Sequence, residues 1–478
     1  MRAARAALWY RPKNLGAAAC GSGRYADLVA FVPQSSHHQM DLLVASLSLI
    51  MLAALAFVGA RRWWGQPLQR GWTVIKLRPM ETQLVVQMLP AICTLSAYEG
   101  AADNACVELL RSRVANVVSQ NPWLAGRLVR QRGHIVLAQP PPSDLPSCFE
   151  VHEDALADLT HAPYEEISAR LRPFRVRRGL ACIDADDEPL FRVALVRDFR
   201  ASKSLVVVSL SHIIGDGHTF YALHAMLNGE ARPLDPVRPT HFDAGSDAAF
   251  GMTKNAYLFS LPALLGFVGN MFFKPAFRVR VVTVDDEWVA AQKAGHAAAR
   301  AAKGGGGDGD VAWVSTNDVL TSWALTAGGY AYGAMAINCR GRLPETHEDL
   351  AGNYENVVQY WPEDFHTPAG VRLSLLSPPR FMSVRTEVPS LADSLRSNMA
   401  TVTNWATFYT PLALPTCTLC LHLPMAMDEY PTAGHFVVFA HGVSKDGLAV
   451  ILAERRDAVA RREAAADGPR LRDLLMHR

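Results

Sequence analysis

The sequence predicts an α/β protein in which strands and helices follow one another along the chain. A valine-rich run at 205–210 is followed by a helical pattern at 219–227. Later, a helical pattern at 315–325 is followed by a strand-like run at 330–337. The chain has 478 residues, 50% of them hydrophobic, and this is enough for two domains, each with its own core.

The N-terminal part contains a predicted membrane span. A run without charge at 42–60 is long enough to cross a bilayer as a helix, and two arginines and two tryptophans follow it at 61–64. We expect an uncleaved anchor at 40–64 rather than a cleaved signal peptide, because the apolar run is long and arginines follow it. Residues 1–39 carry arginines and one acidic residue, which is typical of a disordered or transit-like leader.

The charge around the span predicts its orientation. More basic residues follow it than precede it, so a single-pass protein with its catalytic part in the cytoplasm is expected. A second apolar run, 256–273, contains Pro262, Gly266 and Gly269, which weaken a straight spanning helix. Two interpretations of this run remain open, a buried helix and an interfacial segment.

Composition argues against several classes of function. The formal net charge is +2 with no basic stripe, so no nucleic-acid partner is predicted, and we expect a monomer. Among eight cysteines only Cys417 and Cys420 have a C-x-x-C spacing, inside an apolar, strand-like run at 412–423. No second pair completes a zinc site, so small core or edge residues are favoured over a redox or metal pair, and no metal site is predicted.

The first predicted domain, 70–289, contains a helix followed by a hairpin. Residues 100–130 show helical spacing of apolar side chains, stopped by a proline, and then the approach to a strand. Two strand-like runs, 190–196 and 205–210, flank a polar turn and predict a hairpin.

The second predicted domain, 311–478, follows an alanine- and glycine-rich segment. We interpret 290–310 as a flexible linker because a run of four glycines cannot form regular structure, although a charged helix with core positions could occupy its alanine-rich part. Further along, 436–440 and 448–452 flank a glycine-containing turn and predict a second hairpin. The arginine-rich end, 453–478, predicts a surface helix with a loose tail.

A candidate site lies where the strand at 205–210 ends. His212 comes directly after this strand, Asp216 follows four residues later, and Gly217 is next to it. An imidazole at the edge of a rigid sheet is well placed to act as a general base, since its usual pKa is near neutrality. Gly217 allows a tight bend and the approach of a ligand. Asp216 has two compatible roles, orienting the histidine loop and capping the following helix.

Several further motifs give the His-x-x-x-Asp spacing a specific context. In chain order they are Leu-Ala-Gly-Arg-Leu at 124–128, Ser-Thr-Asn-Asp at 315–318, Asn-Cys-Arg-Gly-Arg at 338–342, Gly-Asn at 352–353 and Thr-Asn-Trp at 403–405. Over roughly 72–460 this order resembles the BAHD acyltransferases of the chloramphenicol-acetyltransferase-like superfamily. The Asp-Phe-Gly-Trp-Gly motif usual near the C-terminus of that family is absent, which indicates a divergent branch.

The resemblance implies a fold, a reaction and roles for residues. The fold would be two chloramphenicol-acetyltransferase-like domains with mixed sheets flanked by helices, preceded here by the single transmembrane helix. The reaction would be acyl transfer from acyl-CoA, as co-substrate, to a hydroxyl or amine, with no bound cofactor and His212 as base. Asp216 would form an ion pair with Arg340 that braces the loop. Thr403 and Trp405 would line the acceptor side, with Thr403 donating to the oxyanion.

Two alternatives to this function remain open. One is a transferase of the wax-ester or diacylglycerol type, and the other is a catalytically silent, membrane-tethered binding protein that retains the fold. The predicted anchor at 42–60 and the apolar run at 256–273 favour a lipophilic acceptor or a long acyl donor. His218 and His224 are expected to be packing or surface residues.

Overall fold

A computed structural model describes residues 70–154, 162–273, 277–304, 311–376, 381–383, 385–396, 399–442, 447–465 and 468–475. These residues belong to one compact unit of the chain. The predicted leader at 1–39 and the predicted anchor at 40–64 lie outside them. Within the described ranges, no helix is long and apolar enough to cross a bilayer.

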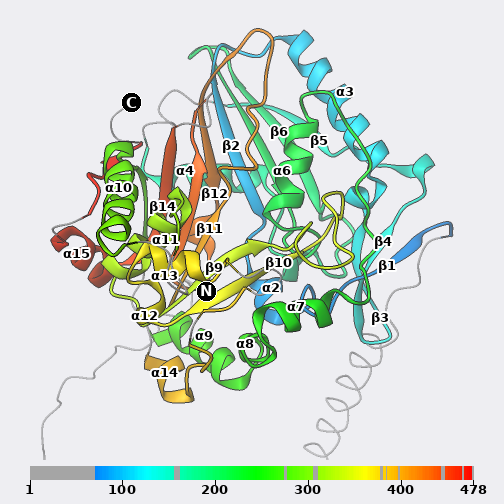
Figure 1. Ribbon diagram of the computed structural model, residues 1–478. Helices are drawn as coiled ribbons and strands as arrows, with labels where there is room; N and C mark the ends of the chain where they lie inside the picture. Colours follow the sequence, from blue (N-terminus) through cyan, green and yellow to red (C-terminus); the bar gives the residue numbers. More distant parts are fainter. Residues whose placement is uncertain are drawn as a thin grey trace, which may run out of the picture. The chain divides into compact units, whose positions relative to one another are not determined.

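The first large sheet has five strands and holds His212 at the end of its central strand (Figure 1). Its order is β12 (Thr418–Met425), β2 (Ile92–Glu99), β7 (Lys203–Leu210), β6 (Phe191–Asp198) and β5 (Phe149–Glu153). β5 is parallel to β6, and the other neighbours are antiparallel. Nearly every residue of β7 is buried, as expected for a strand covered on both faces.

The second large sheet has seven strands and supplies the other side of the site. Its order is β10 (Glu355–Tyr360), β9 (Tyr332–Asn338), β11 (Met399–Asn404), β13 (His435–Ala440), β14 (Leu448–Arg455), β8 (Phe277–Thr283) and β15 (Arg472–Asp473). β11 is parallel to both of its neighbours, so the sheet is mixed. A separate three-stranded sheet has the order β1 (Thr73–Lys76), β4 (His134–Gln139) and β3 (Arg127–Gln131).

Helices pack against the sheets and between them. They are α2 (Leu84–Met88), α3 (Asn104–Gln120), α4 (Tyr164–Leu171), α5 (Gly179–Cys182), α6 (Gly217–Met226), α7 (Phe242–Phe250), α8 (Met252–Leu258), α9 (Leu261–Phe273), α10 (Asp286–Ala302), α11 (Thr316–Ala327), α12 (Pro362–Phe365), α13 (Pro368–Leu373), α14 (Leu391–Arg396) and α15 (Arg456–Ala464). Two of these helices begin at capping residues that belong to the sequence motifs. The Asp216 side chain accepts from Thr219 N at the start of α6, and the Ser315 side chain accepts from Asp318 N at the start of α11.

The two halves of the chain exchange strands. β12 comes late in the sequence but pairs with β2 in the first sheet, in register over most of its length. β8 precedes the glycine-rich segment but pairs with β14 in the second sheet. Each large sheet therefore needs residues from both halves, and the two hydrophobic cores form together.

The strands and helices predicted around the motifs are confirmed. The two hairpins correspond to β6–β7 and β13–β14, the two helices to α6 and α11, and the run at 330–337 to β9.

Three predictions about segments are corrected in part. The alanine-rich part of the predicted linker forms the helix that its composition allowed, α10, begun by Asp285, whose carboxylate caps it, and 305–310 lie outside the described residues. The predicted strand at 412–423 begins at Thr418 instead. The surface helix predicted within 453–478 is confirmed as α15, but β14 continues to Arg455 before it, and the edge strand β15 follows it.

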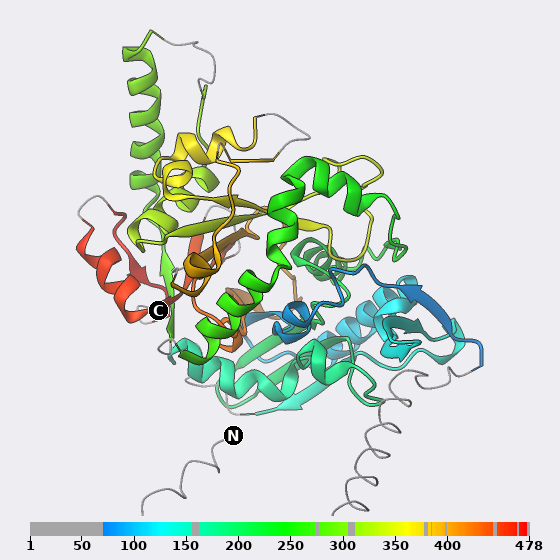
Figure 2. The same ribbon diagram turned by 90° about the horizontal axis from the view of Figure 1, so that it is seen from below.

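The apolar run at 256–273 forms two helices rather than one. α8 ends at Leu258 and α9 begins at Leu261, so the chain turns at Phe259 and Ser260. In both views the green helices α8 and α9 lie beside the orange α14 (Figures 1 and 2). A hydroxyl–hydroxyl contact of 2.9 Å joins Tyr257 to Ser394 within this group.

Candidate active site

His212 projects from the end of β7, where the first sheet meets the start of β10 from the second sheet. Its side chain is 12% exposed. Such a position combines a rigid backbone with limited access to solvent, which are the conditions that a general base needs.

Asn353 fixes the tautomer of His212. The Nδ2 amide of Asn353 donates to the backbone carbonyls of His212, at 2.9 Å, and of Ile213, at 3.2 Å. Its Oδ1 atom is therefore an acceptor, and it lies 3.2 Å from His212 Nδ1. The proton of the neutral imidazole is then on Nδ1, which leaves the lone pair on Nε2 available to accept a proton.

Glu355 stands opposite the free nitrogen of His212. Its Oε1 atom lies 3.9 Å from His212 Nε2, so the oxygen of an acceptor hydroxyl can reach both atoms within hydrogen-bond distance. Although 31% of its side chain is exposed, burial of the carboxyl group raises the pKa of Glu355, and the neighbouring His212 opposes that rise. The sequence analysis missed this residue. An acidic residue in the otherwise uncharged strand Glu355–Tyr360 is the signal that marks it.

Asp216 faces Arg340, not His212. Its Oδ2 atom accepts from Arg340 Nη1 and from Tyr354 N, each at 2.8 Å, and its Oδ1 atom accepts from Thr219 N at 2.9 Å. Burial by itself would raise the pKa of Asp216, but the charge and hydrogen bonds of Arg340 hold that pKa below its ordinary value. The carboxylate is thus fully used as a brace and a helix cap, and no hydrogen bond joins it to the imidazole.

Arg340 ties several parts of the site together. Its guanidinium donates to Leu350 O at 2.8 Å and to Gly352 O at 2.9 Å, in addition to Asp216. Only 1% of the residue is exposed. A planar fork of donors suits this task, since each nitrogen reaches a different acceptor.

A second buried ion pair supports the same loop. Arg238 donates to both oxygens of Glu81, each at 3.1 Å, and to Ala351 O at 3.0 Å. Glu81 also accepts from Asn353 N at 3.0 Å. Burial would raise the pKa of Glu81, but the two neighbouring arginines, Arg238 and Arg78, lower it. This pair was not predicted from the sequence. Arg78 was counted among the basic residues that follow the predicted membrane span, but the structure buries it in the folded part.

Gly217, Thr403 and Trp405 line a small cavity of about 40 Å³ together with Glu355. A Cβ atom at Gly217 would lie 2.8 Å from Trp405 Nε1, so glycine is required there by the indole. Trp405 itself is 6% exposed and belongs to the first core. The neighbouring Asn404 donates to Asn317 Oδ1 at 3.1 Å, which brings the Thr-Asn-Trp and Ser-Thr-Asn-Asp motifs together.

The two other histidines near the site, His218 and His224, have different surroundings. His218 was expected to lack a partner, but its Nε2 atom lies 2.9 Å from Glu348. His224 is fully buried, as one of the two alternatives expected, and packs among aromatic side chains. Neither lies against the free nitrogen of His212, where Glu355 is found.

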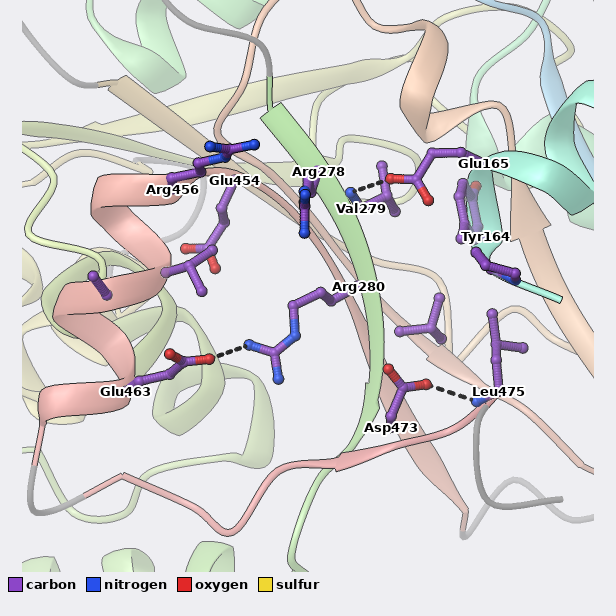
Figure 3. A pocket seen from close by; sticks show the side chains of 14 residues that line it. Tyr164, Glu165, Arg278, Val279, Arg280, Glu454, Arg456, Glu463, Asp473 and Leu475 are labelled. Atoms are coloured by element: carbon purple, nitrogen blue, oxygen red, sulfur yellow. Dashed lines mark hydrogen bonds and ion pairs between the residues drawn. The ribbon is translucent and has the colours of Figure 1, made fainter. Parts of the chain in front are cut away.

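A larger cavity of about 830 Å³ lies elsewhere, between β8, α15 and the C-terminal strand (Figure 3). Several of its charged side chains have partners: Arg280 pairs with Glu463 at 3.0 Å, and Glu165 accepts from Val279 N at 3.0 Å. None of the candidate site residues lines it. In the part of the chain that is described, no group of three His, Cys, Asp or Glu side chains is placed to hold a metal ion.

Comparisons with known proteins give a fold. No protein-family model matches the sequence, and no curated protein matches it. Among solved structures, Fusarium graminearum TRI101 with coenzyme A and deoxynivalenol matches at a TM-score of 0.55, with 13% identity, over 84% of this chain and 99% of that one. Fusarium sporotrichioides TRI101 with coenzyme A and T-2 matches at 0.51, with 14% identity, over 84% and 100%.

The chain has the fold of these proteins. A third structure, polyketide synthase associated protein 5 from Mycobacterium tuberculosis, matches at 0.50, with 12% identity, over 83% of this chain and 98% of that one. The predicted resemblance to chloramphenicol-acetyltransferase-like, BAHD-type acyltransferases is therefore confirmed as a fold over most of the chain. The membrane helix predicted in front of it lies outside the described residues.

Proposed function

We propose that this protein is a CoA-dependent acyltransferase that moves an acyl group from acyl-CoA to a hydroxyl or amine, with His212 as general base. The observation that carries the proposal is the fixed imidazole: Asn353 binds Nδ1, and Nε2 faces Glu355 across a gap of 3.9 Å. A fold shared with TRI101, whose crystal structures hold coenzyme A, supports acyl-CoA as the co-substrate.

The proposed reaction needs one base that works twice. As the acceptor oxygen attacks the thioester carbon, its proton moves to Nε2 of His212, and a tetrahedral intermediate forms. The intermediate collapses when the C–S bond breaks, and the leaving thiolate takes the proton from the imidazolium, so ester and CoA thiol are released. A thioester is already activated, so this route uses no covalent intermediate on the protein.

Three neighbouring side chains have supporting roles in this proposal. The Glu355 carboxylate, when ionised, stabilises the imidazolium that forms next to it. The Thr403 hydroxyl, which makes no hydrogen bond within the described part of the chain, can donate to the oxyanion. Trp405 closes the cavity on the side of Gly217 and limits the shape of the acceptor.

The location of the enzyme, at a membrane, is also a proposal. The apolar run at 42–60, with arginine and tryptophan directly after it, supports a single-pass anchor with the catalytic part in the cytoplasm. An enzyme held at a bilayer meets lipophilic acceptors at high local concentration, so we infer an acceptor of that class.

An assay of CoA thiol release tests the function. The full-length protein is incubated with acyl-CoA donors of increasing chain length and, in separate reactions, with a fatty alcohol, a diglyceride, or a terpenoid or aromatic alcohol, and compared with His212→Ala. We expect thiol release to fall at least about 10²-fold in the variant. Release that is equal in both proteins overturns the proposal. Tight acyl-CoA binding without turnover identifies a silent binding protein, and turnover only with fatty alcohol or diglyceride identifies the wax-ester or diacylglycerol type.

A further inference from the structure

Exposed apolar side chains gather on the helices formed by the run at 256–273 and on their neighbours. We call this surface the apolar face, and its residues are Leu84, Phe259, Leu261, Leu264, Leu265, Leu391 and Leu395. Leu261 is 66% exposed, Leu84 53% and Phe259 47%. A gathering of large apolar side chains on the surface marks an interaction site more often than chance exposure does.

Helix α9 is apolar on every side. It contains no charged residue over its thirteen positions. Gly266 and Gly269 face α14, where a Cβ at Gly266 would meet the backbone of Ser394 at 2.6 Å. Leu261 and Leu265, one turn apart, remain exposed on the outside. A helix of this composition is normally covered all round, so its outer side is prepared for an apolar environment.

A pocket opens in the middle of the apolar face. Its volume is about 370 Å³, and Leu84, Phe259 and Leu264 both line it and remain exposed, so they form its mouth. Ala263 and Phe267 line it from α9. The charged residue that lines the pocket, Arg455, is 8% exposed and donates to Asn270 Oδ1 at 2.7 Å, so the exposed residues of the mouth are apolar.

The pocket leads toward the candidate active site along β11. Met399 and Thr401 line the pocket, and Thr403 lines the small cavity beside Glu355. Alternate residues of a strand point to the same face, so these three side chains lie in a row on one face of β11.

A second line of contacts joins the same two places. His435 lines the pocket and stacks near Tyr430, with ring centroids 4.3 Å apart. Burial raises the pKa of Tyr430, and the nearby Glu355 carboxylate adds to this rise. Glu355 in turn lies 3.9 Å from His212.

We propose that the apolar face rests on the surface of a lipid bilayer and that the pocket admits the aliphatic chain of a membrane-dissolved substrate toward His212. The direction of the pocket rests on the proposed function, whereas the docking itself does not. Of the two interpretations of the run at 256–273, a buried helix and an interfacial segment, this proposal favours the interfacial segment.

Two observations favour a bilayer over another occupant. The predicted span at 42–60 ends only ten positions before Arg70, where the described chain begins, so a short tether would keep the folded part near a membrane. α9 is about 20 Å long, too short for a hydrocarbon core of about 30 Å, and therefore suits the interface plane.

Hydrogen–deuterium exchange on the full-length protein tests the docking. Exchange is compared with and without phosphatidylcholine vesicles in the wild type and in a Leu261→Glu, Leu265→Glu double variant, whose side chains do not line the pocket. The matched control is Leu180→Glu, Phe199→Glu, at residues 51% and 55% exposed elsewhere on the surface. We expect vesicles to slow exchange over 261–273 about tenfold in the wild type and the control, but not in the double variant.

Each other outcome overturns the docking proposal. Unchanged exchange on vesicles removes the bilayer as the partner. Protection of 261–273 without vesicles, independent of protein concentration, means that another segment of the chain covers the face, and protection that grows with concentration means that a second copy does. Thiol release measured on the same wild-type sample separates the two proposals, because vesicle protection without thiol release contradicts the acyltransferase function and leaves the docking intact.

Discussion

At the residue scale, Asn353 decides which nitrogen of His212 can act as a base. We expect Asn353→Leu to lower kcat about 10²-fold, because the imidazole loses the acceptor that keeps its proton on Nδ1. KM for acyl-CoA should stay within about twofold, since Asn353 does not bind the donor in this scheme. Steady-state kinetics measures both. An equal loss in kcat for a stability-matched variant far from the site would mean that Asn353 acts only through folding.

Glu355 is predicted to act through charge. We expect Glu355→Gln to lower kcat/KM about tenfold, because the imidazolium loses an adjacent negative charge. Burial raises the pKa of the carboxyl group, so its ionisation should appear as an acidic limb of the pH–rate profile, above the range of an ordinary glutamate. Glu355→Gln should lose the part of the acidic limb that belongs to this carboxyl group and keep only that of the base His212, whereas Glu355→Asp should keep both. An acidic limb that is the same in all three proteins contradicts this role.

The residues of the site differ in how far the sequence could predict them. His212, Asp216 and Arg340 belong to short motifs with fixed spacing, and the structure places the last two 2.8 Å apart. Glu81 and Arg238 carry no local signal, because they lie 157 positions apart and meet only in the folded protein. Glu355 lay beside a recognised motif, but its role depends on β10 approaching the end of β7.

At the element scale, the loop 350–354 is held by two buried ion pairs at once. Breaking one of them leaves an uncompensated charge, so Arg340→Met should lower the free energy of unfolding by about 3–5 kcal/mol. Arg111→Met removes an exposed pair with Glu108 and should cost less than about 1 kcal/mol. Urea denaturation of the three proteins measures the difference. Similar losses in both variants would show that the loop does not depend on Arg340.

Elements with local signals were the predictable ones. Helices α6 and α11 begin at capping side chains and carry apolar spacing, and the hairpins are contiguous in sequence. α10 lies where the alanine-rich part of the predicted linker allowed a helix, and the capping residue Asp285 marks its start. β15 has only two residues, and it is a strand because β8 leaves an edge free for it.

At the scale of the whole molecule, the exchange of β8 and β12 between the halves was beyond prediction. Pairing between strands that are far apart in sequence leaves no periodic trace in either strand. As a result the site draws on both large sheets: β7 of the first sheet ends just before His212, and β10 and β11 of the second sheet supply Glu355 and Thr403. The domain boundary predicted at 290–310 stays a prediction, because each large sheet contains strands from both sides of that segment.

A buried histidine pair makes the fold sensitive to acid. His422 on β12 contacts Ser96 and Tyr221, at 3.1 Å each, and its ring lies 5.4 Å from that of His224 on α6. Burial lowers the pKa of both, to about 4 for His224. The unfolded chain, with histidine pKa values near 6.5, binds more protons below that pH, so stability is lost as pH falls from about 6.5 to about 4.

Replacing His224 isolates its share of that loss. Both ring nitrogens of His224 lack a hydrogen-bond partner, so His224→Leu removes two unsatisfied polar atoms from the core without breaking a bond. A shift from 6.5 to about 4 is worth roughly 3 kcal/mol at pH 4, and the variant should lose that much less stability between pH 7 and pH 4 than the wild type. Urea unfolding at both pH values gives the comparison, with the exposed His134→Leu as control. If His224→Leu loses as much as the wild type, the acid sensitivity comes from other groups and the buried pair does not control it.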